Sequence, residues 1–132
     1  MRIVRLDHFG VDVADLERAE RFYTDVLGMS VEMRLPDQVL LRHGGGSVAL
    51  FLKPDRTPGG RELVEDPLGK NHHAFEVSRE DFQAGRGFFV ERGILHHAPI
   101  NWGDYDCLYF LDQDRNLLEL VGYRSHNTNA ST

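Results

Sequence analysis

The feature that most restricts how this chain can fold is an internal repeat about half the chain long. The segment LDHFGVDVADLERAERFYTDVLGM (6–29) aligns with KNHHAFEVSREDFQAGRGFFVERGI (70–94) after a small slippage. Further on, VLLRHGGGSVALFL (39–52) aligns without a gap with LYFLDQDRNLLELV (108–121). Self-similarity at a fixed spacing is the signature of a repeated structural unit. We therefore expect two copies of one unit.

Each copy is expected to contain a strand, a helix and three further strands. Asp15 and Ser78 are predicted helix N-caps, and Gly28 and Gly93 are predicted to end the two helices. In the first copy we expect a strand over 5–13, a helix over 16–27 and strands near 30–35, 38–42 and 47–52. In the second copy, a strand that begins near His72 precedes a helix over 79–92 and strands near 94–98, 106–112 and 116–123. The expected class is α+β, built from two tandem βαβββ modules.

We expect the 132 residues to form one domain (1–132), which is long enough to bury a core. Its expected parts are module one at about 3–54, a linker over 55–70 rich in Gly and Pro, module two at about 71–123 and a polar, frayed tail over 124–132. HGGG (43–46) and DQDR (112–115) are predicted hairpin turns.

Composition excludes several classes of protein. The single cysteine, Cys107, allows no internal disulfide, and MRIVRLDHFG has no apolar signal region, so we expect a cytoplasmic location. No run of residues approaches transmembrane length, so no membrane partner is expected. The net charge of −6 with scattered Lys and Arg argues against nucleic-acid binding.

Strand alternation separates the two histidines of NHHAFEVS. Phe75 and Val77 would share a face with His73 beneath the second helix, which leaves His72 on the opposite face. The same alternation in the first strand places His8 opposite the face that packs on a helix, and the repeat aligns His8 with His72. We therefore expect His8 and His72 to be equivalent and His73 to be a structural residue.

Glu119 supplies a third candidate group, because it lies among leucines and valines in the middle of a predicted strand. A buried carboxylate needs a cation, a proton or a metal ion. Two imidazoles and one carboxylate on the concave face of a sheet would form a facial triad, which is typical of non-haem Fe(II). A single strand histidine is more often structural, and a lone Glu more often forms an ion pair, so the prediction depends on the three residues together. His43, His126 and the His96–His97 pair do not share this pattern, although His96 or His97 could lie near a substrate.

These residues carry a resemblance to the vicinal oxygen chelate superfamily of glyoxalase I, extradiol dioxygenases, fosfomycin-resistance enzymes, methylmalonyl-CoA epimerase and bleomycin-binding proteins. The segments are LDHFGVDVADLERAERFYTDVLGM, HHAFEV and LYFLDQDRNLLELVGY, and the resemblance covers nearly all of residues 3–123. In the last of them, Gln113 and Arg115 replace the family's usual Pro and Gly in a turn. The resemblance implies paired βαβββ modules around an open, barrel-like cleft (the glyoxalase/dioxygenase fold).

The resemblance implies that His8, His72 and Glu119 are the metal ligands, with the family's fourth position on Leu50. An apolar residue there argues against glyoxalase I and the epimerase, which use four protein ligands. Gly10 stands where the fosfomycin thiol transferases have Thr. Tyr109 matches a tyrosine of the extradiol enzymes, ten residues before the metal Glu. No histidine stands at their acid–base position, for which His97 is the nearest candidate.

We therefore expect a metal-dependent enzyme whose divalent ion chelates two adjacent oxygens of a small substrate, most similar to an extradiol dioxygenase. Fe(II) is the favoured ion, and Mn, Zn, Ni or Co are alternatives. Tyr109 and His97 are the expected catalytic residues, with Tyr105 as another proton relay. The linker, through Arg56, Arg61 and Lys70, could meet an anionic substrate, although a solvated loop is the simpler interpretation.

Three alternatives remain at this stage: a drug-binding resistance protein without catalysis, a glyoxalase or lyase activity, and a structural relic that keeps the triad. The resemblance also implies a homodimer. In some members, His8 of one chain would join His72 and Glu119 of the other.

Overall fold

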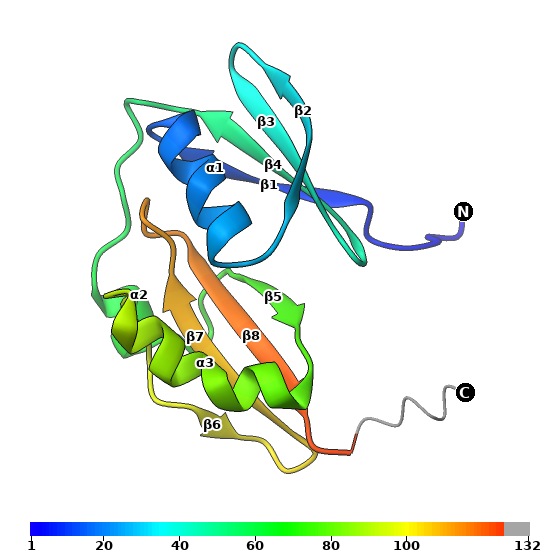
Figure 1. Cartoon of the computed structure of the whole chain (residues 1–132), viewed down its shortest axis with the longest axis vertical. Helices are drawn as coiled ribbons and strands as arrows, with labels where there is room; N and C mark the ends of the chain where they lie inside the picture. Colours follow the sequence, from blue (N-terminus) through cyan, green and yellow to red (C-terminus); the bar gives the residue numbers. More distant parts are fainter. Residues whose placement is uncertain (126–132) are drawn as a thin grey trace. The chain divides into compact units, whose positions relative to one another are not determined.

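In the computed structural model, residues 1–125 are described, and the chain divides into two compact units. Unit 1 covers residues 1–58, and unit 2 begins at residue 59. Each unit contains one four-stranded mixed sheet with a helix against it, which confirms the α+β class and the two tandem modules (Figure 1). The frayed tail that the sequence predicts lies, from residue 126 onward, outside the described residues. No helix within residues 1–125 is long and apolar enough to cross a membrane.

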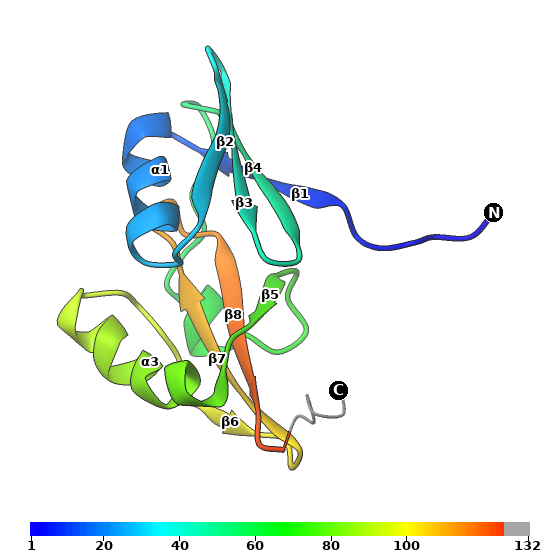
Figure 2. The ribbon, with the colours of Figure 1, turned by 45° about the vertical axis from the view of Figure 1, so that its right-hand side comes forward.

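Unit 1 has the strand order β1-β4-β3-β2, in which β1 and β4 are parallel and the other pairs antiparallel. Its helix α1 packs against β3 and β4 and buries Ala19, Phe22 and Tyr23 (Figure 2). The Asp15 side chain accepts a hydrogen bond from the Arg18 N–H, as an N-cap should. The bounds are β1 His8–Val13, α1 Leu16–Asp25, β2 Ser30–Leu35, β3 Gln38–His43 and β4 Gly46–Leu52.

Unit 2 repeats this arrangement in the order β5-β8-β7-β6, in which β5 and β8 are parallel. Helix α3 packs on one face of the sheet, where Phe89 meets Phe110 with ring centroids 4.6 Å apart. Ser78 caps α3 through a hydrogen bond from the Asp81 N–H. The bounds are α2 Glu62–Glu65, β5 His73–Glu76, α3 Arg79–Glu91, β6 Ile100–Asn101, β7 Tyr105–Leu111 and β8 Leu117–Tyr123.

Two expectations about unit 2 were wrong. The strand predicted near 94–98 is only a single bridge between His96 and Phe110, and the strand next to β7 is β6 instead. Pro99 lies between them, and proline has no N–H to donate to a strand ladder. The predicted linker also contains a helical turn, α2, because Val64 is buried against the sheet and Arg61 pairs with Glu65 at 3.3 Å.

The turn between β7 and β8 is held by the buried carboxylate of Asp112, which accepts from the backbone N–H groups of Asp114 and Asn116. Arg115, at the position where the resembling family has Gly, adopts a φ of 62°. Non-glycine residues adopt this left-handed conformation at a cost in free energy. The turn therefore has a residue less suited than glycine to this backbone conformation.

Candidate functional site

His72 and Glu119 form the closest pair of predicted ligands. The Nε2 atom of His72 lies 2.9 Å from Oε1 of Glu119, and the Glu119 side chain is only 9% exposed. His72 directly precedes β5, whereas Glu119 lies in the middle of β8, opposite Ala74. Strand alternation therefore brings His72, Ala74 and Glu119 to one face of the sheet.

The other ring nitrogen of His72 determines what this contact means. Nδ1 lies 2.7 Å from the carbonyl oxygen of Lys70, and a carbonyl only accepts hydrogen bonds, so Nδ1 carries a proton. In a neutral imidazole, Nε2 then presents a lone pair toward the Glu119 carboxylate. Two lone pairs at 2.9 Å require a proton or a cation between them. A histidine with Nδ1–H bonded to a carbonyl and Nε2 directed at the site has the tautomer of a metal ligand.

Tyr109 lies beside this pair. It is the cross-strand partner of Glu119, and its ring meets the His72 ring edge-on with centroids 5.1 Å apart. Burial, followed by the negative charge of Glu119, raises the pKa of Tyr109 to about 12. The hydroxyl is therefore neutral at ordinary pH and able to donate a hydrogen bond.

Cys107 and Trp102 belong to the same face, although the sequence analysis assigned them no role. The Trp102 Nε1–H donates to the Cys107 sulfur at 3.2 Å, and Cys107 is fully buried. Burial raises the pKa of the Cys107 thiol to about 11, with a further contribution from a hydrogen bond to Glu119. Cys107 lies two residues before Tyr109 in β7, so strand alternation was the signal that could have found it.

His97 lies next to Tyr109 but outside a regular strand. Its backbone N–H donates to the Tyr109 carbonyl at 2.9 Å. Leu95 packs into the apolar cluster that contains Tyr109, while His96 packs against Phe89 on the α3 side, so alternation places His97 on the Tyr109 side. Its Nδ1 lies 2.7 Å from the Ala98 carbonyl, which leaves Nε2 as the basic nitrogen.

His73 behaves as the structural residue that strand alternation predicts. It pairs with Leu118 in the sheet, on the α3 side, and is half-buried. Burial lowers its pKa, and the neighbouring His72 lowers it further.

The helical turn α2 covers part of the Glu119 face within unit 2. Val64 and Leu63 pack against Cys107, Tyr109, Leu111 and Leu117. The predicted linker therefore buries an apolar surface, and at its end the Lys70 carbonyl holds His72.

His8 lies in unit 1, on the face that α1 does not cover. Its Nδ1 lies 2.8 Å from Oδ2 of Asp7, and Asp7 also pairs with Arg5 at 3.1 Å. The hydrogen bond with His8, and then the charge of Arg5, lower the pKa of Asp7. His8 and His72 thus share one property, an Nδ1 held by an oxygen, which leaves Nε2 available.

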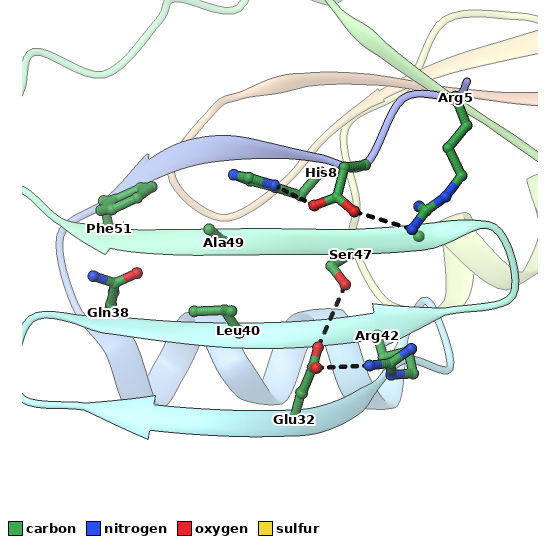
Figure 3. A pocket seen from close by; sticks show the side chains of 11 residues that line it. Arg5, His8, Glu32, Gln38, Leu40, Arg42, Ser47, Ala49 and Phe51 are labelled. Atoms are coloured by element: carbon green, nitrogen blue, oxygen red, sulfur yellow. Dashed lines mark hydrogen bonds and ion pairs between the residues drawn. The ribbon is translucent and has the colours of Figure 1, made fainter. Parts of the chain in front are cut away.

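A hollow of about 320 Å³ opens beside His8 on this face of unit 1 (Figure 3). Ser47 and Arg42 stand opposite His8 in one row across β4 and β3. Glu32, in the bulge of β2, pairs with Arg42 at 2.6 Å and accepts from Ser47 at 3.4 Å. The remaining lining residues on β3 and β4 are Gln38, Leu40, Gly46, Ala49 and Phe51.

The expected fourth ligand position requires a correction. Gly10 pairs with Ala49 in unit 1 as Ala74 pairs with Glu119 in unit 2, so the counterpart of Glu119 is Ala49. Leu50 is fully buried in the core of unit 1 instead. The ungapped alignment was one residue out of register, because the β3–β4 turn is shorter than the β7–β8 turn. The counterpart remains apolar.

Of the predicted site residues, unit 2 brings together His72, Glu119 and Tyr109. The backbone of His97 is hydrogen-bonded to that of Tyr109. His8 has its own surroundings in unit 1. Within residues 1–125 there is no group of three or more His, Cys, Asp or Glu side chains close enough to hold a metal ion. The donor set of His72 and Glu119, one imidazole nitrogen and one carboxylate oxygen, nevertheless fits a divalent transition metal.

Two βαβββ units, each with a histidine at or next to the start of its first strand, define a glyoxalase-like fold. The buried Glu119 of unit 2 corresponds to Ala49 in unit 1. The sequence matches the Glyoxalase/Bleomycin resistance protein/Dioxygenase superfamily over residues 5–120, and the chain belongs to this family.

Similar proteins span several activities. The chain is 29% identical to a catechol-2,3-dioxygenase of Bacillus subtilis (strain 168) over 119 residues, which are 88% of this chain but only 40% of that protein. It is 27% identical to the glutathione transferase FosA of Serratia marcescens, over 87% of this chain and 78% of that one. The crystal structure of the fosfomycin resistance protein FosX from Listeria monocytogenes has a TM-score of 0.75 at 19% identity, with 92% of this chain and 94% of that chain covered. At that identity the likeness concerns the fold alone.

Proposed function

We propose that this protein is a metal-dependent enzyme that binds a divalent ion, Fe(II) by preference, through His8, His72 and Glu119. It would act on a small substrate with two adjacent oxygens, as an extradiol-type dioxygenase does. The observation that carries the proposal is the His72–Glu119 contact, in which a buried carboxylate oxygen faces the Nε2 atom of an imidazole at 2.9 Å. A divalent ion would provide the charge that this pair requires.

Two features of unit 1 favour the dioxygenase over other activities of the family. Ala49 at the counterpart of Glu119 supplies no fourth ligand, which leaves open positions for a chelating substrate and O₂. A Cβ atom at Gly10 would lie 2.8 Å from Cε2 of Phe51, so the threonine of the resembling thiol transferases would require this ring to move. The similarity to a catechol dioxygenase also supports this assignment.

The overall reaction would join catechol and O₂ to give a ring-opened hydroxymuconic semialdehyde. Both oxygen atoms enter the product, so no external reductant is consumed. When bound, the ion would act as a Lewis acid that lowers the pKa of a substrate hydroxyl and orients its two oxygens.

The protein's own side chains would handle the protons of this reaction. Tyr109, whose pKa of about 12 keeps its hydroxyl neutral, would donate a hydrogen bond to a substrate oxygen. Nε2 of His97 would accept a substrate proton and return it to the product, since its Nδ1 is held by the Ala98 carbonyl. The buried, apolar cover of Val64 and Leu63 would limit the access of water to this face.

The test is oxygen consumption with catechol after anaerobic reconstitution with Fe(II). The wild type should consume one O₂ per ring opened, and His72→Ala should not. His73→Ala is the matched control, because it removes the adjacent histidine on the opposite face of the sheet. Equal turnover in His72→Ala and the wild type would contradict the proposal.

A further inference from the structure

The Phe51 ring lies across Gly10 in the hollow of unit 1. A Cβ atom at Gly10 would stand 2.8 Å from Cε2 and 3.1 Å from Cδ2 of that ring. The first distance is shorter than real Cβ contacts and the second is tighter than most of them, so the ring in this position fits over a glycine and would have to shift for any larger residue. Phe51 pairs in the sheet with Asp12, two residues beyond Gly10 in β1. Because its ring reaches Gly10, the ring extends back along the sheet toward His8.

The hollow has a charged end and an uncharged end, at which Phe51 stands beside the amide of Gln38. Rows of side chains that face the same side of a sheet are about 7 Å apart along the strands. The row of His8, Ser47 and Arg42 is followed by the row of Gly10, Ala49 and Leu40. Figure 3 shows Arg5 and Arg42 at one end and Phe51 at the other, with Ala49 and Leu40 between them as the floor.

The side chains at the charged end neutralise one another. Arg42 is paired with Glu32 and Arg5 with Asp7, so the hollow offers no unpaired cation for a strongly anionic ligand among these four residues. Ala49 and Leu40 form an uncharged floor beside the Phe51 ring. This combination suits an uncharged planar ring better than a phosphonate or a charged aliphatic acid.

We propose that Phe51 and Gly10 together determine the specificity of this site for an aromatic ring, which stacks on Phe51 while its adjacent oxygens face His8. This proposal rests on the proposed function for the position of the oxygens, although contact with the ring does not require the metal. An aromatic contact of this kind contributes to affinity beyond the area it buries. The volume of about 320 Å³ accommodates one substituted ring.

The experiment compares two chelating probes on metal-loaded protein under anaerobic conditions, by isothermal titration calorimetry. Catechol has a ring and oxalate has none. Phe51→Ala should weaken catechol binding about tenfold and leave oxalate binding within about twofold. Phe51→Leu, which keeps an apolar side chain of similar length, should weaken catechol binding about threefold if ring stacking contributes beyond apolar contact. Gly10→Ala should weaken catechol binding because it displaces the ring.

Equal losses for catechol and oxalate, or unchanged catechol binding in both Phe51 variants, would overturn the proposal. The same catechol titration is also run on chelator-treated protein. If the wild type binds no metal, the proposed function fails. The effect of Phe51→Ala on catechol binding to the metal-free chain then still tests whether the aromatic ring binds on Phe51.

Discussion

Units 1 and 2 have the same order of strands, yet the sheet faces that carry His8 and His72 differ in what lies on them. In unit 1 this face is an open hollow with paired charges and an apolar floor. In unit 2 it holds a buried carboxylate and a buried tyrosine, and α2 covers part of it. One copy of the repeat therefore has an open hollow on this face, and the other keeps its carboxylate buried.

The difference can be traced to single positions. The pair Gly10–Ala49 in unit 1 corresponds to Ala74–Glu119 in unit 2, so the buried carboxylate of Glu119 has no counterpart at this position of unit 1.

The largest expected effect comes from removing that carboxylate. Glu119→Gln should lower the affinity for Fe(II) by more than about 100-fold, because loss of a ligand should exceed the effect of losing an outer-shell partner. Ala49→Gln, at the corresponding position of unit 1, is the matched control and should retain metal. Equilibrium dialysis against a competing chelator measures both, and similar losses in the two variants would contradict the asymmetry.

A second comparison concerns the packing of unit 2. Gly122→Ala should lower the free energy of unfolding by about 2 kcal/mol, because its Cβ atom would meet Cβ and Cγ of Phe82 at 2.6 Å. Gly87→Ala, in α3 with open space around it, should instead raise it by about 1 kcal/mol. Urea unfolding followed by circular dichroism measures both changes. A stable Gly122→Ala variant would show that α3 packs less closely than described.

The buried groups of unit 2 should make stability depend on alkaline pH. The pKa values of Cys107 and Tyr109 are raised from 9.0 to about 11 and from 10.0 to about 12. The folded state keeps these protons where the unfolded state has lost them, so stability is full below about pH 9 and falls as pH rises toward 12. Urea midpoints of chelator-treated protein should show this fall. Tyr109→Phe should reduce the fall in stability above pH 10. An unchanged dependence of stability on pH in this range would count against the burial of Tyr109.

The smallest effect concerns the turn that precedes Glu119 in the chain. Arg115→Gly should raise the free energy of unfolding by about 1 kcal/mol, because glycine adopts a φ of 62° without strain. Arg86→Gly, in the exposed part of α3, should lower it by about 1 kcal/mol. Thermal melts of both variants check the opposite signs. A destabilised Arg115→Gly would mean that the arginine contributes contacts that offset its backbone strain.

Much of this architecture could be predicted from the sequence because its signals are local. Asp15 and Ser78 cap the helices as expected, and strand alternation correctly separated His72 from His73. The fold class and the family also follow from the repeat and its motifs.

Features that depend on contacts distant in sequence could not be read in the same way. Sheet register places Ala49, rather than Leu50, opposite Gly10, and a slip of one residue reverses every side chain. The burial of Val64, which orders α2, depends on β7 more than forty residues later in the chain. The position of Phe51 over Gly10 likewise requires the pairing of β1 with β4.

The most direct test of the central claim is elemental analysis of anaerobically purified protein beside His8→Ala, His72→Ala and Glu119→Ala, with His73→Ala as the control. The account predicts about one divalent ion per chain in the wild type and in His73→Ala, and its loss in the other three variants. Wild-type protein that holds no divalent ion even after reconstitution would contradict the account, and so would metal retained in both His72→Ala and Glu119→Ala.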